Sequence, residues 1–230
     1  MSGPSDPDGE IEAIRERYQR RKTTAVASRY PAFSAFQHFS RAEREFWYGT
    51  YLMQRFGDRK DLTVLEIGAG GGDNIVFLRR FGLAAGSIFA NELLDERAER
   101  LREWLGVDNI LPGDARALDL PGRFDAVLQS TVFSSILDPG VRAQLAEKMW
   151  DLLKPGGVVL WYDFHVNNPS NPDVRGVSWR EVRRLFPHAA GWNRRKVTLA
   201  PPIGRRVGRL YNFLNVPFLR THTVAMIRKP

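Results

Sequence analysis

The chain has 230 residues, of which 43% are hydrophobic, and a mean hydropathy of −0.34. This length suits one α/β domain with a large buried core. The absence of cysteine excludes disulfides, thiolate metal sites and a cysteine nucleophile. The first residues lack the apolar core of a signal peptide, and no apolar run approaches the roughly 20 residues that span a bilayer. We therefore expect a soluble, cytoplasmic protein.

The chain is basic, with a formal net charge of +8 and a pI of about 10.1. Positive residues gather near both ends of the chain, at 15–22, 194–196 and 205–206. Such a charge permits attraction to nucleic acid, anionic lipid or phosphorylated small molecules. The alternative is that most arginines only solvate helix surfaces.

The first residues precede the main pattern. Residues 1–9 are small and polar, which predicts a disordered tail. A helix is expected from about Ile11 to Lys22. A second helix is predicted to open at Ser40, because Ser40 and Glu43 have the spacing of a capping box. Aromatic and aliphatic residues of that helix then supply core contacts, namely Phe46, Trp47, Leu52 and Phe56.

From residue 62 onward, short apolar strands alternate with helices. Candidate strands cover residues 62–68, 87–92, 109–111, 124–130, 157–164, 197–199 and 223–227, and helices lie at about 73–81, 95–105 and 140–153. A further capping box, Ser178 with Glu181, marks one more helix. This alternation predicts a mainly parallel sheet with helices on both faces. We assign residues 10–58 to an N-terminal helical cap and 59–230 to the core of the same domain.

The strongest local signal is VLEIGAGGGD, residues 64–73, in which a buried strand ends in a glycine-rich turn that opens a helix. Gly68, Gly70 and Gly72 let the backbone approach a ligand closely. A dinucleotide fingerprint needs glycine or alanine where this chain has Asp73, and no Walker lysine follows. The pattern favours a nucleoside-like cofactor without a diphosphate, so an NAD-dependent oxidoreductase ranks low. Packing alone also explains some turns of this kind.

Two acidic residues follow the next two strands. Glu92 ends the second strand, about 20 residues after the glycines, where a carboxylate accepts hydrogen bonds from ribose hydroxyls. Asp114, in LPGDA, is placed to accept a hydrogen bond from an adenine amino group. The alternatives are a helix N-terminal carboxylate for Glu92 and an ordinary turn residue for Asp114.

The succession EIGAGGG, NE, GDA, FDAVLQS and LLKPGG resembles class I S-adenosylmethionine-dependent methyltransferases over roughly residues 60–165. More narrowly, QSTVFSSILD, WYDF, NPDVRG and LRTH resemble bacterial small-molecule methyltransferases found with glycan and natural-product pathways. The resemblance implies a Rossmann-like, seven-stranded, mostly parallel sheet whose last strand is antiparallel. It also implies that S-adenosylmethionine binds above the carboxyl ends of the strands and leaves as S-adenosylhomocysteine.

The same resemblance implies which residues contact the cofactor. Gly68, Ala69 and Gly70 would face the methionine part, Glu92 the ribose, and Asp114 with Ala115 the adenine. Gln129 is expected under the sulfonium. The expected set is completed by Glu66, Leu93 and Ser130.

Methyl transfer to a hydroxyl also needs a group that removes a proton, generally His, Asp or Glu. In the family fold Asp163, His165 and His222 would surround the acceptor, and we take them as the catalytic candidates. The alternatives are that Asp163 anchors a loop and that the histidines lie in loops or the core. The four histidines lack metal-ligand spacing, so no metal is expected.

We therefore expect methyl transfer to a small-molecule hydroxyl or amine, such as a sugar or natural-product intermediate, saccharide or anionic in character. An RNA or other nucleic-acid methyltransferase ranks second, because QSTVF stands where amino-methylating members carry Asp/Asn-Pro-Pro-Tyr/Phe. A non-catalytic cofactor-binding protein is a third alternative. Three aromatic or imidazole residues are candidates to close over the cofactor, namely Tyr18, Tyr30 and His38. Residues 201–220 have three alternative interpretations: a lid over the acceptor, a helix that rests on membrane lipid, or a helix packed on the sheet.

Overall fold

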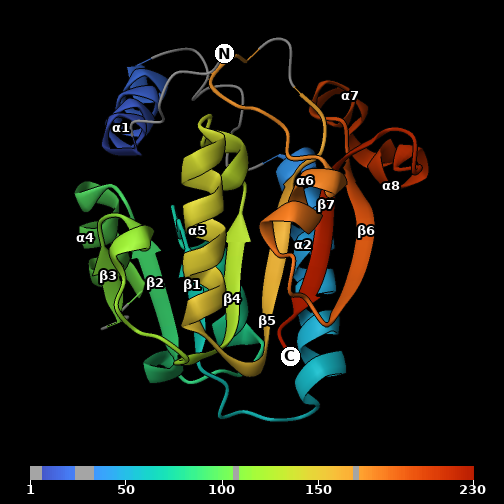
Figure 1. Cartoon of the computed structure of the whole chain (residues 1–230). Helices are drawn as coiled ribbons and strands as arrows, with labels where there is room; N and C mark the ends of the chain where they lie inside the picture. Colours follow the sequence, from blue (N-terminus) through green and yellow to red (C-terminus); the bar gives the residue numbers. More distant parts are fainter. Residues whose placement is uncertain (1–6, 24–33, 106–108, 168–170) are drawn as a thin grey trace.

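The computed structural model describes residues 7–23, 34–105, 109–167 and 171–230. Its centre is a seven-stranded sheet in the order β3-β2-β1-β4-β5-β7-β6 (Figure 1). The strands are β1 (Val64–Ile67), β2 (Ile88–Glu92), β3 (Ile110–Pro112), β4 (Phe124–Ser130), β5 (Leu153–Phe164), β6 (Gly191–Leu199) and β7 (Arg220–Arg228). Strand β7 runs antiparallel to both of its neighbours, and the other pairs are parallel. The predicted Rossmann-like sheet with an antiparallel last strand is confirmed.

Helices cover both faces of the sheet, as the alternation of strands and helices predicts. On one face the apolar residues of α2 (Ala35–Phe56), α3 (Asp73–Arg80) and α4 (Asp95–Leu105) share a core with the strands. On the other face α5 (Pro139–Leu152) and α6 (Trp179–Leu185) pack against the opposite side chains of the strands (Figure 1). No helix among the described residues is long and apolar enough to cross a bilayer.

The N-terminal helices differ from the sequence prediction. Helix α1 (Pro7–Thr23) already includes residues 7–9, which we expected in the disordered tail, while residues 1–6 lie outside the described range. Helix α2 begins at Ala35, because the side chain of Ser34 accepts a hydrogen bond from the Gln37 backbone N–H at 3.2 Å. Ser40 lies inside the helix and donates back to the Gln37 carbonyl, so the capping box predicted there is wrong.

Helix α2 packs against the sheet and contributes to the core. Tyr48, Tyr51 and Leu52 are buried on the sheet, and the Tyr48 hydroxyl donates to the Gln129 carbonyl at 2.8 Å. Figure 1 shows α2 behind the sheet and α1 above the strand ends. Of the two N-terminal helices, α1 alone lies over that end of the molecule.

The C-terminal third forms an edge and a projecting helical segment. The predicted cap of α6 is confirmed, since Ser178 accepts from the Glu181 N–H. Strand β6 is longer than predicted, because residues 193–196 continue the edge strand with exposed polar side chains. Helix α7 (Pro201–Val207), the short 3-10 helix η5 (Gly208–Leu210) and α8 (Tyr211–Leu214) follow. Tyr211 is buried and stacks on Phe39 of α2.

Candidate functional site

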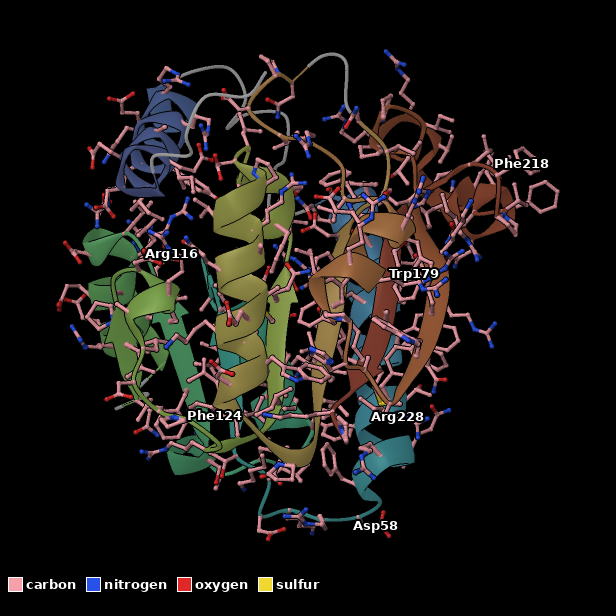
Figure 2. All side chains as sticks on the ribbon, viewed as in Figure 1. Asp58, Arg116, Phe124, Trp179, Phe218 and Arg228 are labelled. Carbon is pink, nitrogen blue, oxygen red and sulfur yellow. The ribbon has the colours of Figure 1, made fainter. Side chains whose placement is uncertain are left out.

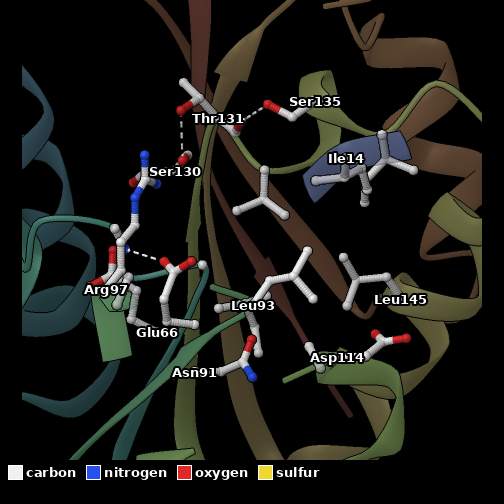
Figure 3. Close-up of a pocket in the computed structure, with 18 of the residues that line it drawn as sticks. Ile14, Glu66, Asn91, Leu93, Arg97, Asp114, Ser130, Thr131, Ser135 and Leu145 are labelled. Carbon is white, nitrogen blue, oxygen red and sulfur yellow. Dashed lines mark hydrogen bonds between the residues drawn. The ribbon is translucent and has the colours of Figure 1, made fainter. Parts of the chain in front are cut away.

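A pocket lies at the carboxyl ends of β1, β2 and β4, with α1 on its far side. Figure 3 shows Glu66 and Asn91 on the strand side of the pocket, with Ile14 of α1 and Leu145 of α5 opposite. Parallel sheets of this kind bind ligands at the carboxyl ends of their strands. Most of the cofactor residues expected from the sequence line this pocket, namely Glu66, Gly68, Ala69, Gly70, Glu92, Leu93, Asp114, Ala115 and Ser130.

The glycine-rich turn forms the floor beside β1. Gly68 has a φ of +66°, and a Cβ there would come within 2.6 Å of the Val132 side chain. Gly70 also has a positive φ, of +57°, which disfavours any other residue. The Gly70 N–H donates to the Glu92 carboxylate at 2.7 Å. Gly68 is therefore required both by backbone conformation and by close approach, and Gly70 by backbone conformation.

Glu92 is held firmly where β2 ends. It is buried, and its carboxylate also accepts from the Leu94 N–H at 3.0 Å. The preceding Asn91 donates to the carbonyls of Leu111 and Gly113, both at 2.9 Å, and so ties the end of β2 to the turn after β3. This explains a polar residue in a buried strand and fixes the carboxylate of Glu92 at the pocket wall.

Asp114 lies across the pocket, beside an apolar wall. Its carboxylate accepts from the Arg116 backbone N–H at 2.9 Å and pairs with the Arg116 guanidinium at 2.7 Å. Sequence reasoning missed Arg116, which also lines the pocket. The neighbouring wall is apolar and is made by Ile14, Leu93, Ala115, Ile136, Val141 and Leu145. A flat aromatic ring with a polar edge fits such a slot.

Glu66 and Asn74 present unpaired acceptors at the other end of the pocket. Both side chains are buried, and the Asn74 amide donates to Glu66 at 2.6 Å. Glu66 Oε2 and Asn74 Oδ1 have no hydrogen-bond partner among the described residues. Burial raises the pKa of Glu66 to about 8, against the lowering effects of Asn74 and Arg44. Two unpaired buried acceptors favour a ligand that brings a donor, above all a cation.

Arg44 reaches this end of the pocket from α2. Its guanidinium carbon lies 5.4 Å from the centre of the Tyr162 ring. Its Nε is buried and has no partner among the described residues. An unpaired buried guanidinium N–H favours an anionic ligand group, since charge-assisted hydrogen bonds to carboxylates are strong. Arg44 therefore lies near Glu66 and is placed to bind a negatively charged ligand group, whereas Glu66 is placed to bind a positively charged one.

Helix α1 closes the pocket. Ile11, Ile14 and Tyr18 line it. Two charged residues fasten the helix, since Glu10 accepts from the Leu137 N–H at 2.7 Å and Arg17 donates to the Ser135 carbonyl at 3.1 Å. Of the lid candidates, Tyr18 is thus at the pocket. His38 packs on Phe39 within α2 and is not among the lining residues, and Tyr30 lies outside the described residues.

The end of β4 differs from expectation. Gln129 is fully buried and does not line the pocket, because its Oε1 accepts from the Val132 N–H at 3.1 Å beneath the turn. Ser130 and Thr131 line the pocket instead. Thr131 has a φ of +58°, a conformation rarely taken by β-branched residues, and its hydroxyl donates to the Ser130 carbonyl. Backbone outliers of this kind cluster at functional sites.

Asp163, one of the three catalytic candidates, is an anchor rather than a pocket residue. It is fully buried, and its two carboxylate oxygens accept from the backbone N–H groups of Ser134 and Phe164 at 3.0 and 2.8 Å. It is not among the residues that line the pocket. Burial raises its pKa to about 6. Asp163 fixes the short 3-10 helix η4 (Phe133–Ser135), which follows Thr131 and Val132 of the pocket wall.

The two histidines lie at the adjoining ends of β5 and β7. The His222 ring is buried between Tyr162 and Phe164, with ring centres 5.0 and 3.9 Å away. Burial lowers the pKa of His222 to about 3, so its ring is neutral at pH 7. His165 is half-buried, with its Nδ1 3.4 Å from the Thr223 hydroxyl, and burial also lowers its pKa. The structure places neither histidine in the lining of the pocket.

Arg142 links the pocket wall to the segment after β5. The side chain is fully buried. Its guanidinium donates to the Ile136 carbonyl at 2.7 Å, to the Arg175 carbonyl at 2.9 Å and to Glu181 at 2.6 Å. Ile136 lines the pocket, and Glu181 belongs to α6. One cation thus satisfies groups from three separate segments.

Comparisons with known proteins agree with this fold. Residues 64–157 match the family model described as a methyltransferase domain. A possible histamine N-methyltransferase from Thermotoga maritima, described as dependent on S-adenosylmethionine, has 15% identity, a TM-score of 0.63 and coverage of 96% of this chain and 99% of its own. A Burkholderia thailandensis 1,6-didemethyltoxoflavin N1-methyltransferase, solved with S-adenosylhomocysteine, has 15% identity, a TM-score of 0.62 and coverage of 100% and 93%. No curated protein matches the sequence.

The chain therefore has the fold of S-adenosylmethionine-dependent methyltransferases, and its residues 64–157 match a methyltransferase domain. Its methyltransferase domain match begins with β1 and ends within β5, so the glycine turn, Glu92 and Asp114 all fall inside it. Helices α1 and α2 fall outside it. Arg44 and the pocket residues of α1 are thus features that this chain adds to the matched region.

Proposed function

We propose that this methyltransferase binds S-adenosylmethionine in the pocket and transfers its methyl group to a hydroxyl or amine of a small molecule, such as a sugar or natural-product intermediate. One observation carries the cofactor assignment. The pocket pairs buried, unsatisfied acceptors on Glu66 and Asn74 with an unsatisfied donor on Arg44. These charges match the ammonium and carboxylate of the methionyl part.

The remaining residues fit the rest of the cofactor in order. Glu92 is placed to accept from the ribose hydroxyls while it holds Gly70 and Leu94. The apolar slot by Asp114 suits the adenine ring. When bound, S-adenosylmethionine supplies an electrophilic methyl group on a sulfonium. The residues of this chain contribute alignment and exclusion of water, with α1 covering the pocket.

The acceptor belongs beyond the end of β4, between Thr131 and the segment that follows β5. The small-molecule class is supported by the Burkholderia enzyme, whose structure holds 1,6-didemethyltoxoflavin. For a hydroxyl acceptor, His165 is our candidate for the group that takes the proton. It is the only one of the three sequence candidates that is half-buried rather than buried, and its lowered pKa leaves the ring neutral at pH 7.

Binding of S-adenosylmethionine, S-adenosylhomocysteine and NADH to wild type and Glu92→Ala tests the cofactor by calorimetry. We expect both adenosyl compounds to bind wild type at micromolar Kd and about 10- to 100-fold more weakly to the variant. Transfer of labelled methyl groups to a panel of sugars, amines and RNA then tests the acceptor, with His165→Gln beside wild type. Binding of NADH alone contradicts the cofactor, and labelling of RNA alone contradicts the small-molecule acceptor.

A further inference from the structure

The charge of the chain is divided unevenly along the sequence. Residues 182–230 contain eleven lysines and arginines and no aspartate or glutamate. The 181 residues before them hold 23 basic and 26 acidic residues and so carry a net charge of −3. The net positive charge of the protein therefore resides in its last 49 residues, which form the end of α6 together with β6, α7, η5, α8 and β7.

These cationic elements are neighbours in the structure. Strand β6 is the edge of the sheet, and its Arg194, Arg195 and Lys196 are exposed. Helices α7 and α8 follow β6 and lie at the same end of the sheet as the pocket (Figure 1). Arg206 of α7 and Arg209 of η5 are exposed cations of this region. One side of the molecule is thus positively charged up to the level of the pocket.

Large apolar side chains protrude from the same positively charged part of the chain. Phe213 is 82% exposed and Phe218 is 83% exposed, and Leu210 is also exposed. Figure 2 shows Phe218 pointing away from the body of the protein. Exposed apolar groups of this size beside cations are unfavourable in water and favourable at a surface that accepts both.

The segment that carries these side chains is fixed to the protein core. Tyr211 is buried against Phe36 and Phe39 of α2, and its hydroxyl accepts from the Leu199 N–H at 3.1 Å. Asn215 donates to Glu43 of α2 at 3.0 Å. The protruding phenylalanines are therefore held on a rigid support, which reduces the entropy cost of ordering them on a partner.

We propose that residues 201–220, named here the cationic segment, dock on the surface of an anionic lipid bilayer. Phe213, Phe218 and Leu210 enter the boundary between headgroups and acyl chains, while the arginines pair with lipid phosphates. Two attractions acting together give stable but reversible attachment. A nucleic acid is less suited, since single strands stack on aromatic rings within a cationic groove, whereas these rings protrude from α8 and from the turn that follows it. Docking brings the pocket end of the sheet towards the membrane.

The test is sedimentation of the full chain with vesicles. Two kinds are compared: phosphatidylcholine alone, and phosphatidylcholine with about one-third phosphatidylglycerol, an anionic lipid. Wild type is expected to bind the anionic vesicles and to lose affinity as salt is raised. Phe213→Ser with Phe218→Ser is expected to weaken binding at least about 10-fold. Arg206→Gln with Arg209→Gln is expected to weaken binding and to reduce its salt dependence.

Matched controls separate this surface from general charge and apolarity. Phe46→Ser removes a phenylalanine of α2 that is exposed, so the core contact predicted for it from the sequence is wrong. Arg100→Gln with Arg102→Gln removes two cations of α4. Both controls are expected to bind vesicles like wild type. Unchanged affinity for S-adenosylhomocysteine in every variant establishes that folding is intact. Absence of binding to anionic vesicles, or binding that the Phe213 and Phe218 changes leave unaltered, overturns the proposal.

A single-stranded RNA oligonucleotide, followed by fluorescence anisotropy, tests the competing partner. The proposal expects weak, salt-sensitive binding that the loss of the two phenylalanines does not alter. Tighter binding to RNA than to vesicles, lost with the phenylalanines, overturns the lipid assignment and makes the segment a nucleic-acid surface. Neither result depends on which acceptor is methylated, so failure here leaves the proposed function intact.

Discussion

Glu10 of α1 accepts a hydrogen bond from the Leu137 backbone N–H at 2.7 Å, and the same carboxylate pairs with Arg17 at 2.8 Å. This contact joins the first described helix to the segment between η4 and α5. Ile11 and Ile14 of the same helix line the pocket, so the contact holds α1 in place over the pocket.

Removal of this contact is expected to speed cofactor release. Glu10→Ala leaves the Leu137 N–H without its partner and removes the salt bridge of Arg17, so α1 separates from the pocket more often. We expect S-adenosylhomocysteine to dissociate about 10-fold faster, in stopped-flow displacement, with little change in melting temperature. Glu12→Ala is the control, since Glu12 is exposed and pairs with Arg15 on the same helix. Equal dissociation rates in Glu10→Ala and wild type contradict a covering role for α1.

Cofactor binding is expected to release a proton from Glu66. Its pKa of about 8 means that the carboxyl is largely protonated at pH 7, and a bound ammonium favours the ionised form. Affinity for S-adenosylhomocysteine should therefore rise as pH increases towards 8 and be nearly flat in Glu66→Gln. Calorimetry at pH 7 in buffers of different ionisation enthalpy measures the proton. Methylthioadenosine, which lacks the amino acid part, is the control ligand and should release none. Heats that do not depend on the buffer contradict this role.

Arg44 is expected to discriminate between cofactor analogues by their carboxylate. Arg44→Gln should bind S-adenosylhomocysteine about 10- to 100-fold more weakly, while its affinity for methylthioadenosine should equal that of wild type. Arg41→Gln is a matched control one turn earlier in α2, where the guanidinium pairs with Asp73 at 3.0 Å. Equal losses for both ligands in Arg44→Gln would indicate a structural role instead.

His222 is expected to affect stability at low pH more than chemistry at pH 7. Burial lowers its pKa from 6.5 to about 3, so the unfolded chain binds the proton first as pH falls. The stabilisation associated with the neutral His222 ring is fully present above pH 6.5. Between pH 6.5 and 3 the unfolding free energy decreases by about 1 kcal/mol per pH unit, because the unfolded chain takes up the proton and the folded chain does not. His222→Phe keeps a ring in the stack and removes the titration. The unfolding free energy of wild type minus that of the variant should decrease as pH falls from 6.5 to 3. A difference that does not change with pH contradicts the assignment.

The parts of the site that were predictable from sequence are local ones. The glycine turn, Glu92 and Asp114 each follow directly from a strand end, and the order of strands and helices determines that these ends meet. Glu66 of β1 and Ser130 at the end of β4 also line the pocket. These predictions needed only the strand boundaries, which apolar runs and glycines mark well.

Side-chain direction at the ends of β5 and β7 was not predictable in this way. Successive residues of a strand point to opposite faces, so a shift of one residue decides what a side chain contacts. His222 pairs in register with Phe164 and stacks in the core, while the carboxylate of Asp163 turns to Ser134. Arg44 was missed because its place depends on how α2 packs on a sheet formed later in the chain.

The buried guanidinium of Arg142 couples the pocket wall at Ile136 to the segment that follows β5. It holds the Ile136 carbonyl at the cofactor wall and the Arg175 carbonyl in the segment after β5 with one rigid, planar group. A substitution that reshapes the segment around Arg175 to accept a different methyl acceptor would therefore also displace the cofactor wall. Changes of acceptor preference in this protein should carry a cost in cofactor affinity unless they preserve that carbonyl.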